Sequence, residues 1–191
     1  MSRVELDDRT LRVATLLSAH VIFLSAAALR ILRGTRRHRV RSGGPWWIEY
    51  YPPLVWLPFV LAYVAPLGVP LSPGLRVAGL IAAAAAAVFT ALAMWSLGRG
   101  YGIRMDIFAG HALKMDGPYA IVRHPMYLGV IVFNAAASLS LSSALLLLAT
   151  ALFVVPYTAL RIAREERVLR AGLAGYAEYA QRVPALLPLP R

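Results

Sequence analysis

Residues 126–160 read MYLGVIVFNAAASLSLSSALLLLATALFVVPYTAL, and these 35 residues contain no charged side chain. A helix needs about 20 apolar residues to cross a bilayer, so this stretch is too long for one crossing and barely enough for two. The serines of SLSLSS, Ser138–Ser143, can satisfy backbone groups where two helices reverse direction. The sequence therefore predicts a tight hairpin of two membrane helices with its turn in this segment.

Three segments upstream also approach the length of a membrane span: Leu11–Leu29, Leu54–Val69 and Leu75–Leu97. The middle segment is bounded and interrupted by prolines, and we expect a kinked helix there. After Arg161 the sequence becomes amphipathic and charged. This change predicts an interfacial or cytosolic helix from about Ile162 to Val183.

These segments together predict an all-α integral membrane protein with about five transmembrane helices, including the hairpin, and a cytoplasmic amphipathic C-terminal helix. The chain has the length of one domain, 1–191, with three N-terminal spans in residues 1–97. Its 59% hydrophobic content and mean hydropathy of +0.62 exceed what a soluble core of this size needs.

The net charge of +11 comes from arginines that cluster between the apolar segments. Under the five-span arrangement, sixteen of the 20 Lys and Arg residues fall on one side of the membrane, which predicts that this side is cytoplasmic. A nucleic-acid-binding protein would spread such charge over a soluble surface, so we expect no nucleic-acid partner. The chain has no cysteine and only 4 scattered histidines, so we expect no metal site and no thiol chemistry.

The residues that carry chemistry lie at the two ends of the hairpin. Arg123, His124 and Pro125 precede its first helix, and Glu165 and Glu166 follow its second. An antiparallel hairpin returns its end to the level of its start, so these residues are expected to lie side by side at the cytoplasmic boundary. The upstream segment GHALKMDGPYAIVRHPMYLG, residues 110–129, adds the candidates His111, Lys114, Tyr119 and Tyr127.

These groups could bind an anion, a ribose and an aromatic ring together, as a zwitterionic nucleoside cofactor requires. Simpler interpretations exist for each of them. The two glutamates could begin a solvated helix, and Arg123 with His124 could form a positively charged membrane anchor. We interpret Tyr176 and Tyr179 as structural, since interfacial tyrosines commonly anchor helices.

The segment GPYAIVRHPMYLG, Gly117–Gly129, followed by a hydrophobic hairpin and then EER, Glu165–Arg167, resembles the isoprenylcysteine carboxyl methyltransferases and their bacterial relatives, which include phospholipid methyltransferase-like proteins. The flanks GHALK, from Gly110, and GYAEYAQRVPALLP, to Pro188, are similar to the family as well. The resemblance covers about half of the chain. It implies that residues 98–188 form the cofactor-binding and catalytic half of a membrane methyltransferase.

The resemblance implies a site for S-adenosyl-L-methionine between the hairpin, the connection before it and the C-terminal helix. It places the following residues near that cofactor: His111, Leu113 through its backbone, Tyr119, His124, Pro125, Tyr127, Glu165 and Glu166. Arg123, His124 and Glu165 are the candidate catalytic residues. Arg123 could bind an anionic group with both arms of its guanidinium. His124 or a glutamate could accept a proton from a phenol or alcohol, whereas a carboxylate or thiolate acceptor needs no base.

The expected partners are a lipophilic small molecule or lipidated substrate and membrane lipid. The acceptor atom stays open between oxygen, sulfur and nitrogen. Two other functions fit the same architecture: an NADPH-dependent membrane reductase of a steroid-like or fatty substrate, and a non-enzymatic membrane assembly or transport protein.

Overall fold

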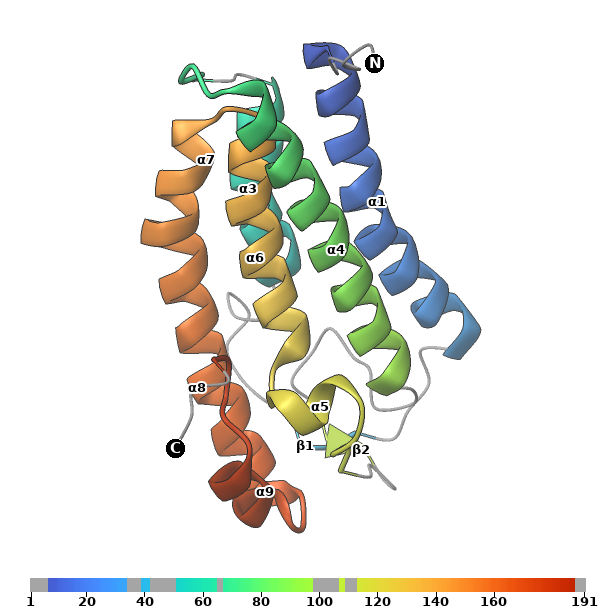
Figure 1. Ribbon diagram of the computed structural model, residues 1–191. Helices are drawn as coiled ribbons and strands as arrows, with labels where there is room; N and C mark the ends of the chain where they lie inside the picture. Colours follow the sequence, from blue (N-terminus) through green and yellow to red (C-terminus); the bar gives the residue numbers. More distant parts are fainter. Residues whose placement is uncertain are drawn as a thin grey trace.

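A computed structural model of the protein describes residues 7–33, 39–41, 51–64, 67–97, 107–108 and 113–187. Within these ranges, long helices lie side by side as a bundle (Figure 1). They are α1 (Asp8–Arg33), α3 (Tyr51–Val64), α4 (Pro73–Leu97), α6 (Pro125–Ser140) and a long helix composed of α7 (Ala144–Ala149), a π-helical turn (Thr150–Val154) and α8 (Val155–Gly172). The predicted all-α membrane fold is thereby confirmed.

The predicted hairpin is formed by α6 and the long helix that begins with α7. Its turn is shorter than expected, because α6 continues through Ser140 and only Leu141–Ser143 reverse the chain. Ser142 adopts a positive φ of 52°, and the side chain of Ser143 accepts a hydrogen bond from the backbone N–H of Leu146 at 3.2 Å. This N-cap satisfies one of the donors that a helix start leaves unpaired.

Three helical segments are long and apolar enough to cross a membrane: Asp8–Leu29, Pro73–Leu97 and Ala144–Gly172. Two shorter apolar helices, Tyr51–Val64 and Pro125–Ser140, complete the bundle. Large apolar side chains such as Leu24 and Leu152 are exposed on its outside, as lipid-facing residues are. The count of five spans stays a prediction, since length and composition alone support three.

The second predicted span, Leu54–Val69, was wrong at its C-terminal end. Helix α3 ends at Val64, and residues 67–72 are not helical. Here Gly68 forms a bridge with Ser143, and the N–H of Val69 donates to the carbonyl of Ser142 at 2.8 Å. Proline 70 lacks an N–H and disfavours a helical residue before it, so the chain crosses to α4 in an extended form.

The prediction of one separate helix from Ile162 to Val183 was also wrong. No helix breaker lies near Arg161, so the second hairpin helix continues through Gly172. The break occurs at Gly175, whose φ of 78° favours glycine, and α9 (Tyr176–Arg182) follows it. In Figure 1, α9 lies below the bundle beside the end of α8.

Close packing of α4 against α6 depends on glycines at both ends of the interface. A Cβ at Gly129 would overlap with the hydroxyl of Thr90, and a Cβ at Gly79 would lie 2.7 Å from that of Leu139. Near Gly79, Thr15 of α1 and Ser140 of α6 share a buried hydrogen bond of 2.7 Å. Small residues at helix interfaces let backbones approach closely inside a membrane.

The two ends of the bundle are chemically different. At the end that carries the start of α1 and the hairpin turn, Arg76 pairs with Asp8 and donates to the carbonyl of Ser140 at 3.1 Å (Figure 1). At the opposite end lie the short helix α5 (Pro118–Ile121), α9 and an antiparallel pair of short strands, β1 (Arg39–Arg41) and β2 (Ile107–Phe108). The candidate site is at this second end.

Candidate functional site

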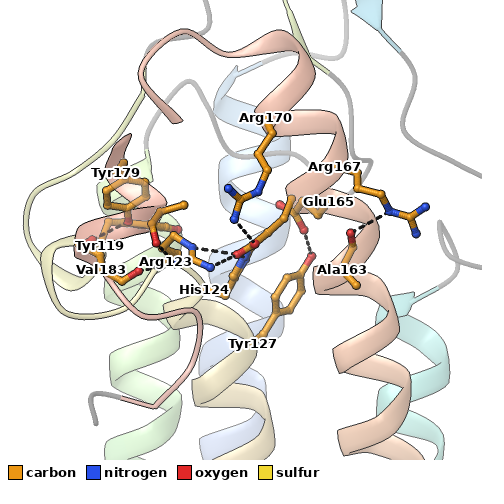
Figure 2. A network of polar contacts seen from close by, with 12 residues as sticks. Tyr119, Arg123, His124, Tyr127, Ala163, Glu165, Arg167, Arg170, Tyr179 and Val183 are labelled. Carbon is orange, nitrogen blue, oxygen red and sulfur yellow. Dashed lines mark hydrogen bonds and ion pairs between the residues drawn. The ribbon is translucent and has the colours of Figure 1, made fainter. Parts of the chain in front are cut away.

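The open end of the hairpin brings together the residues that the sequence predicted there. Arg123 and His124 directly precede α6, while Glu165 and Glu166 lie on α8, 41 to 43 residues later in the chain. Figure 2 shows Arg123, His124, Tyr127 and Glu165 converging between the helices. The hairpin therefore brings Arg123 and His124 to Glu166, and it places Glu165 in a neighbouring set of contacts with Tyr127.

Glu166 is the anchor of this cluster. Its Oε1 accepts hydrogen bonds from Nε of Arg123 at 2.8 Å and from the second guanidinium nitrogen, and it lies 3.2 Å from Nε2 of His124. Its Oε2 accepts from Arg170, four residues later on α8, at 3.1 Å. The Glu166 side chain is 13% exposed and that of Arg123 is 8% exposed, so this ion pair is largely enclosed by protein.

Glu165 belongs to a second, adjacent set of contacts. The hydroxyl of Tyr127 donates to Oε2 of Glu165 at 2.5 Å and accepts from Nε of Arg161 at 2.7 Å. A directed chain of hydrogen bonds thus runs from the guanidinium through the phenol to the carboxylate. Within the described part of the chain, Glu165 accepts hydrogen bonds through one of its carboxylate oxygens, whereas Glu166 accepts them through both.

Arg161 is 4% exposed and lies between aromatic rings. Its guanidinium carbon is 4.9 Å from the ring centre of Tyr51 and 5.8 Å from that of Tyr127. The two tyrosines meet edge to face with ring centres 5.1 Å apart. Such cation–π contacts are strongest where water is excluded, so the rings stabilise a buried positive charge here.

The chain after α9 closes the site through backbone contacts. The N–H groups of Arg123 and His124 donate to the carbonyls of Pro184 and Ala185 at 2.8 and 3.0 Å. The Arg123 guanidinium also donates to the carbonyls of Ala180, at 2.9 Å, and Val183. Arg123 therefore joins the hairpin, α8 and the C-terminal segment.

Three of the other predicted cofactor residues, Pro125, Tyr119 and Leu113, have contacts of their own in this half of the chain. Pro125 is the first residue of α6, which suits a residue without an N–H. The hydroxyl of Tyr119 in α5 is 3.4 Å from the carbonyl of Ala93 on α4. Leu113 packs against the cluster formed by Tyr176, Tyr179 and Ala180. His111 lies outside the described residues.

The interpretation of Tyr176 and Tyr179 as structural fits their positions. Both are 3% exposed, and the hydroxyl of Tyr179 donates to the carbonyl of Tyr119 at 2.6 Å. Burial raises the pKa of Tyr179 to about 12 and raises the pKa of Tyr176 further above its ordinary value. Both phenols stay protonated at physiological pH; Tyr179 serves as a hydrogen-bonding and packing group, and Tyr176 packs edge to face against it with ring centres 5.8 Å apart.

Sequence reasoning missed Arg161, Tyr51 and Arg170 as members of the site. In the sequence, Arg161 served only to mark where the chain becomes charged, yet it lies four residues before Glu165 and so shares its helix face. That spacing was the available signal. No spacing could indicate Tyr51, because it comes from α3, in the other half of the chain. No group of three or more His, Cys, Asp or Glu that could hold a metal occurs in the described ranges.

A family model, a curated relative and a solved structure name the same family. The sequence model of the Isoprenylcysteine carboxyl methyltransferase (ICMT) family matches residues 78–171. Protein-S-isoprenylcysteine O-methyltransferase B of Arabidopsis thaliana is 37% identical over 79 residues, which are 41% of this chain and 40% of that protein. Cobalt-zinc-cadmium resistance protein CzcN of Cupriavidus metallidurans is 37% identical over 82 residues, covering 41% of this chain and 36% of that protein.

The matched segment spans about two fifths of the length of these curated relatives. Among solved structures, the eukaryotic intramembrane Ras methyltransferase ICMT has the same fold, with a TM-score of 0.67 at 20% identity over 98% of this chain and 69% of that chain. The fold likeness extends over both halves of the chain, and the segment matched by the family model includes Arg123, His124, Tyr127, Glu165 and Glu166. The sequence match over residues 78–171 and the shared fold together support the isoprenylcysteine carboxyl methyltransferase family.

Proposed function

We propose that the protein is a membrane methyltransferase that uses S-adenosyl-L-methionine to methylate a lipophilic acceptor. The observation that carries this proposal is the enclosed cluster of Arg123, His124, Tyr127, Glu165 and Glu166 at one end of the hairpin, inside the segment that matches the family. The name of the Arabidopsis relative states an O-methyltransferase of isoprenylcysteine. It supports a carboxylate as the leading acceptor, with a phenol, another hydroxyl or a thiol as alternatives.

The donor and acceptor groups of the cluster fit this cofactor. Glu165 can receive a cation or a ribose hydroxyl, and the rings of His124 and Tyr127, stacked at 5.6 Å, offer faces for adenine or a sulfonium. Pro125, Glu166 and Tyr119 border the same region, and the backbone of Leu113 and the side chain of His111 are the remaining proposed contacts. When bound, the cofactor would supply a methyl group from its sulfonium, and its sulfur would become a neutral thioether when that methyl group is transferred.

The two glutamates then have different tasks. Glu166 holds Arg123, His124 and Arg170 in place, while Glu165 keeps acceptor capacity for the cofactor. Arg123 already donates to Glu166 and to two backbone carbonyls, so its main task is to hold the site together. His124 is the group suited to take a proton from a hydroxyl acceptor. The enclosing helices exclude water and align the acceptor with the methyl group.

Binding of S-adenosylhomocysteine, measured by calorimetry on the purified protein in detergent, tests the proposal, with NADPH as the competing ligand. We expect S-adenosylhomocysteine to bind and NADPH not to bind. Replacing Glu165 with Gln should weaken binding about ten- to a hundred-fold, since a hydrogen bond to a charged group contributes about 1.5 to 3 kcal/mol. Glu178→Gln, at an exposed position of α9, is the control. Binding of NADPH instead would favour the reductase.

We also propose that the site faces the cytoplasm, because the five-span arrangement assigns sixteen of the 20 Lys and Arg residues to the side of the membrane on which the site lies. The chain has no cysteine, so single engineered cysteines report topology cleanly. Arg167→Cys lies at the site end, and Arg9→Cys lies at the opposite end. In intact cells an impermeant thiol reagent should label the second variant and not the first; the reverse pattern contradicts this orientation.

A further inference from the structure

Tyr51 reaches the candidate site from outside the segment that matches the family. It is the first residue of α3, is 4% exposed, and lies 27 residues before the start of the matched segment at residue 78. Its hydroxyl is 2.8 Å from Oγ1 of Thr158. Thr158 donates its one proton to the carbonyl of Val154, so Tyr51 is the donor in this pair. Both the hydroxyl and the ring of Tyr51 are therefore fixed against the second hairpin helix.

The ring of Tyr51 contacts Arg161 and Tyr127, the two residues that form a chain of hydrogen bonds to Glu165. It lies 4.9 Å from the guanidinium carbon of Arg161, meets Tyr127 edge to face and stacks on Tyr157 at 5.5 Å. Arg161 in turn donates to the Tyr127 hydroxyl, which donates to Glu165. Holding an arginine side chain in one rotamer costs conformational entropy, and the contact with a fixed aromatic face offsets part of that cost.

We propose that Tyr51 is a positioning residue for Glu165, acting through Arg161 and Tyr127. The aromatic face holds the guanidinium, the guanidinium orients the phenol, and the phenol orients the carboxylate that receives the cofactor. This chain of contacts couples the N-terminal half of the bundle to the half that carries the site. The inference rests on the proposed function for the task of Glu165, while the link from Tyr51 to Arg161 can be tested without any cofactor.

The first experiment uses the protein without ligand. In a ¹⁵N-arginine-labelled sample, the Nε–H of Arg161 is assigned from its loss in Arg161→Lys, and its exchange with deuterium is followed by NMR. We expect slow exchange in the wild type and in Tyr51→Phe, which keeps the ring. In Tyr51→Leu, exchange should be at least about tenfold faster, because the guanidinium loses its support. Equal exchange in Tyr51→Leu and wild type overturns the inference.

The second experiment is a double-mutant cycle on S-adenosylhomocysteine binding. Tyr51→Leu should weaken binding about tenfold in the wild-type background and less than about twofold when Glu165 is already Gln, since the two residues act in one chain of contacts. Tyr51→Phe should restore most of the loss. A purely structural role predicts equal effects in both backgrounds, and that additivity would overturn the inference.

Phe59→Leu is the matched control, because Phe59 is another aromatic of α3, 2% exposed, two turns away from Tyr51. It should lower thermal stability and remain additive with Glu165→Gln. If Tyr51→Leu does not fold, Arg161→Lys replaces it in the cycle, since lysine keeps the charge and loses the planar stacking. A wild type that does not bind S-adenosylhomocysteine contradicts the proposed function, and the exchange experiment then still decides whether Tyr51 fixes Arg161.

Discussion

The two ends of the bundle contain the same chemical pair, an arginine with a carboxylate, in opposite surroundings. At the hairpin turn, Arg76 pairs with Asp8, whose side chain is 65% exposed. At the site, Arg123 pairs with Glu166, whose side chain is 13% exposed. Exposed pairs contribute about 0 to 1 kcal/mol to stability, whereas removing one partner of an enclosed pair costs about 3 to 5 kcal/mol. We therefore expect the enclosed pair to matter more for stability than the exposed pair.

The largest expected effect comes from breaking each pair in turn. Glu166→Gln leaves the charges of Arg123 and Arg170 without their carboxylate and should lower the free energy of unfolding by about 3 kcal/mol. Asp8→Asn should change it by less than about 1 kcal/mol. Thermal unfolding in detergent micelles, under identical conditions, measures both. Equal losses would show that enclosure does not separate the two ends.

A smaller effect is expected from removing one buried hydroxyl group at each end of the bundle. Tyr127→Phe removes the donor to Glu165 and should weaken S-adenosylhomocysteine binding about ten- to a hundred-fold. Thr15→Val removes the buried bond to Ser140 near the hairpin turn and should cost about 1 kcal/mol of stability with unchanged binding. Calorimetry and thermal unfolding on both variants provide the comparison. Weaker binding in Thr15→Val would mean that the two ends are coupled.

Substitutions that disturb the packing of α4 against α6 should lower stability by similar amounts at both ends of the bundle, in contrast to substitutions of the polar contacts. Alanine at Gly129 or at Gly79 forces α4 and α6 apart and should cost about 1 to 3 kcal/mol of stability. Gly74→Ala is the control, because no atom lies within 4 Å of an added Cβ there. Of the three variants, Gly129→Ala alone should also weaken ligand binding, since it lies two residues from Tyr127. Calorimetric titration of all three tests this selectivity.

The smallest expected effect concerns alkaline pH at the site end. The pKa of Tyr179 is raised by burial to about 12, while an unfolded tyrosine ionises near its ordinary value of 10. Between these two values the unfolded state has lost the proton and the folded state keeps it, so stability should fall as pH rises from 10 to 12. Phenolate absorbance of the wild type minus that of Tyr179→Phe follows the titration. Ionisation of Tyr179 near pH 10 in folded protein would contradict its enclosure.

The sequence was sufficient to predict the hairpin and the approach of Arg123 to the helix segment that carries the two glutamates, because both follow from counting residues along an uncharged stretch. It was insufficient for the different tasks of Glu165 and Glu166. Neighbouring residues on a helix point about 100° apart, and only the packed structure shows which one meets Arg123. Likewise, Arg161 looked like a topological charge until Tyr51 was seen to cover it.

The break between α8 and α9 was missed for a local reason. A glycine that ends a helix resembles the other glycines of the region, and Gly172 and Gly175 both follow a helix-compatible sequence. Positive φ at Gly175 is a property of the folded backbone. The contact of Arg123 and His124 with Pro184 and Ala185 was equally hidden, since it joins backbone groups and leaves no mark in residue type.

The π-helical turn at Thr150–Val154 has a consequence for insertions and deletions in this chain. A π turn accommodates one more residue than an α turn, and every residue of an α-helix advances the side-chain direction by about 100°. Deleting a single residue within the turn would let the helix relax to regular α geometry with Arg161, Glu165 and Glu166 still facing the hairpin's first helix, whereas a deletion after the turn would rotate all three by about 100°. Length variation among related chains should therefore avoid the stretch between this turn and the glutamates, and collect in the connections outside the bundle.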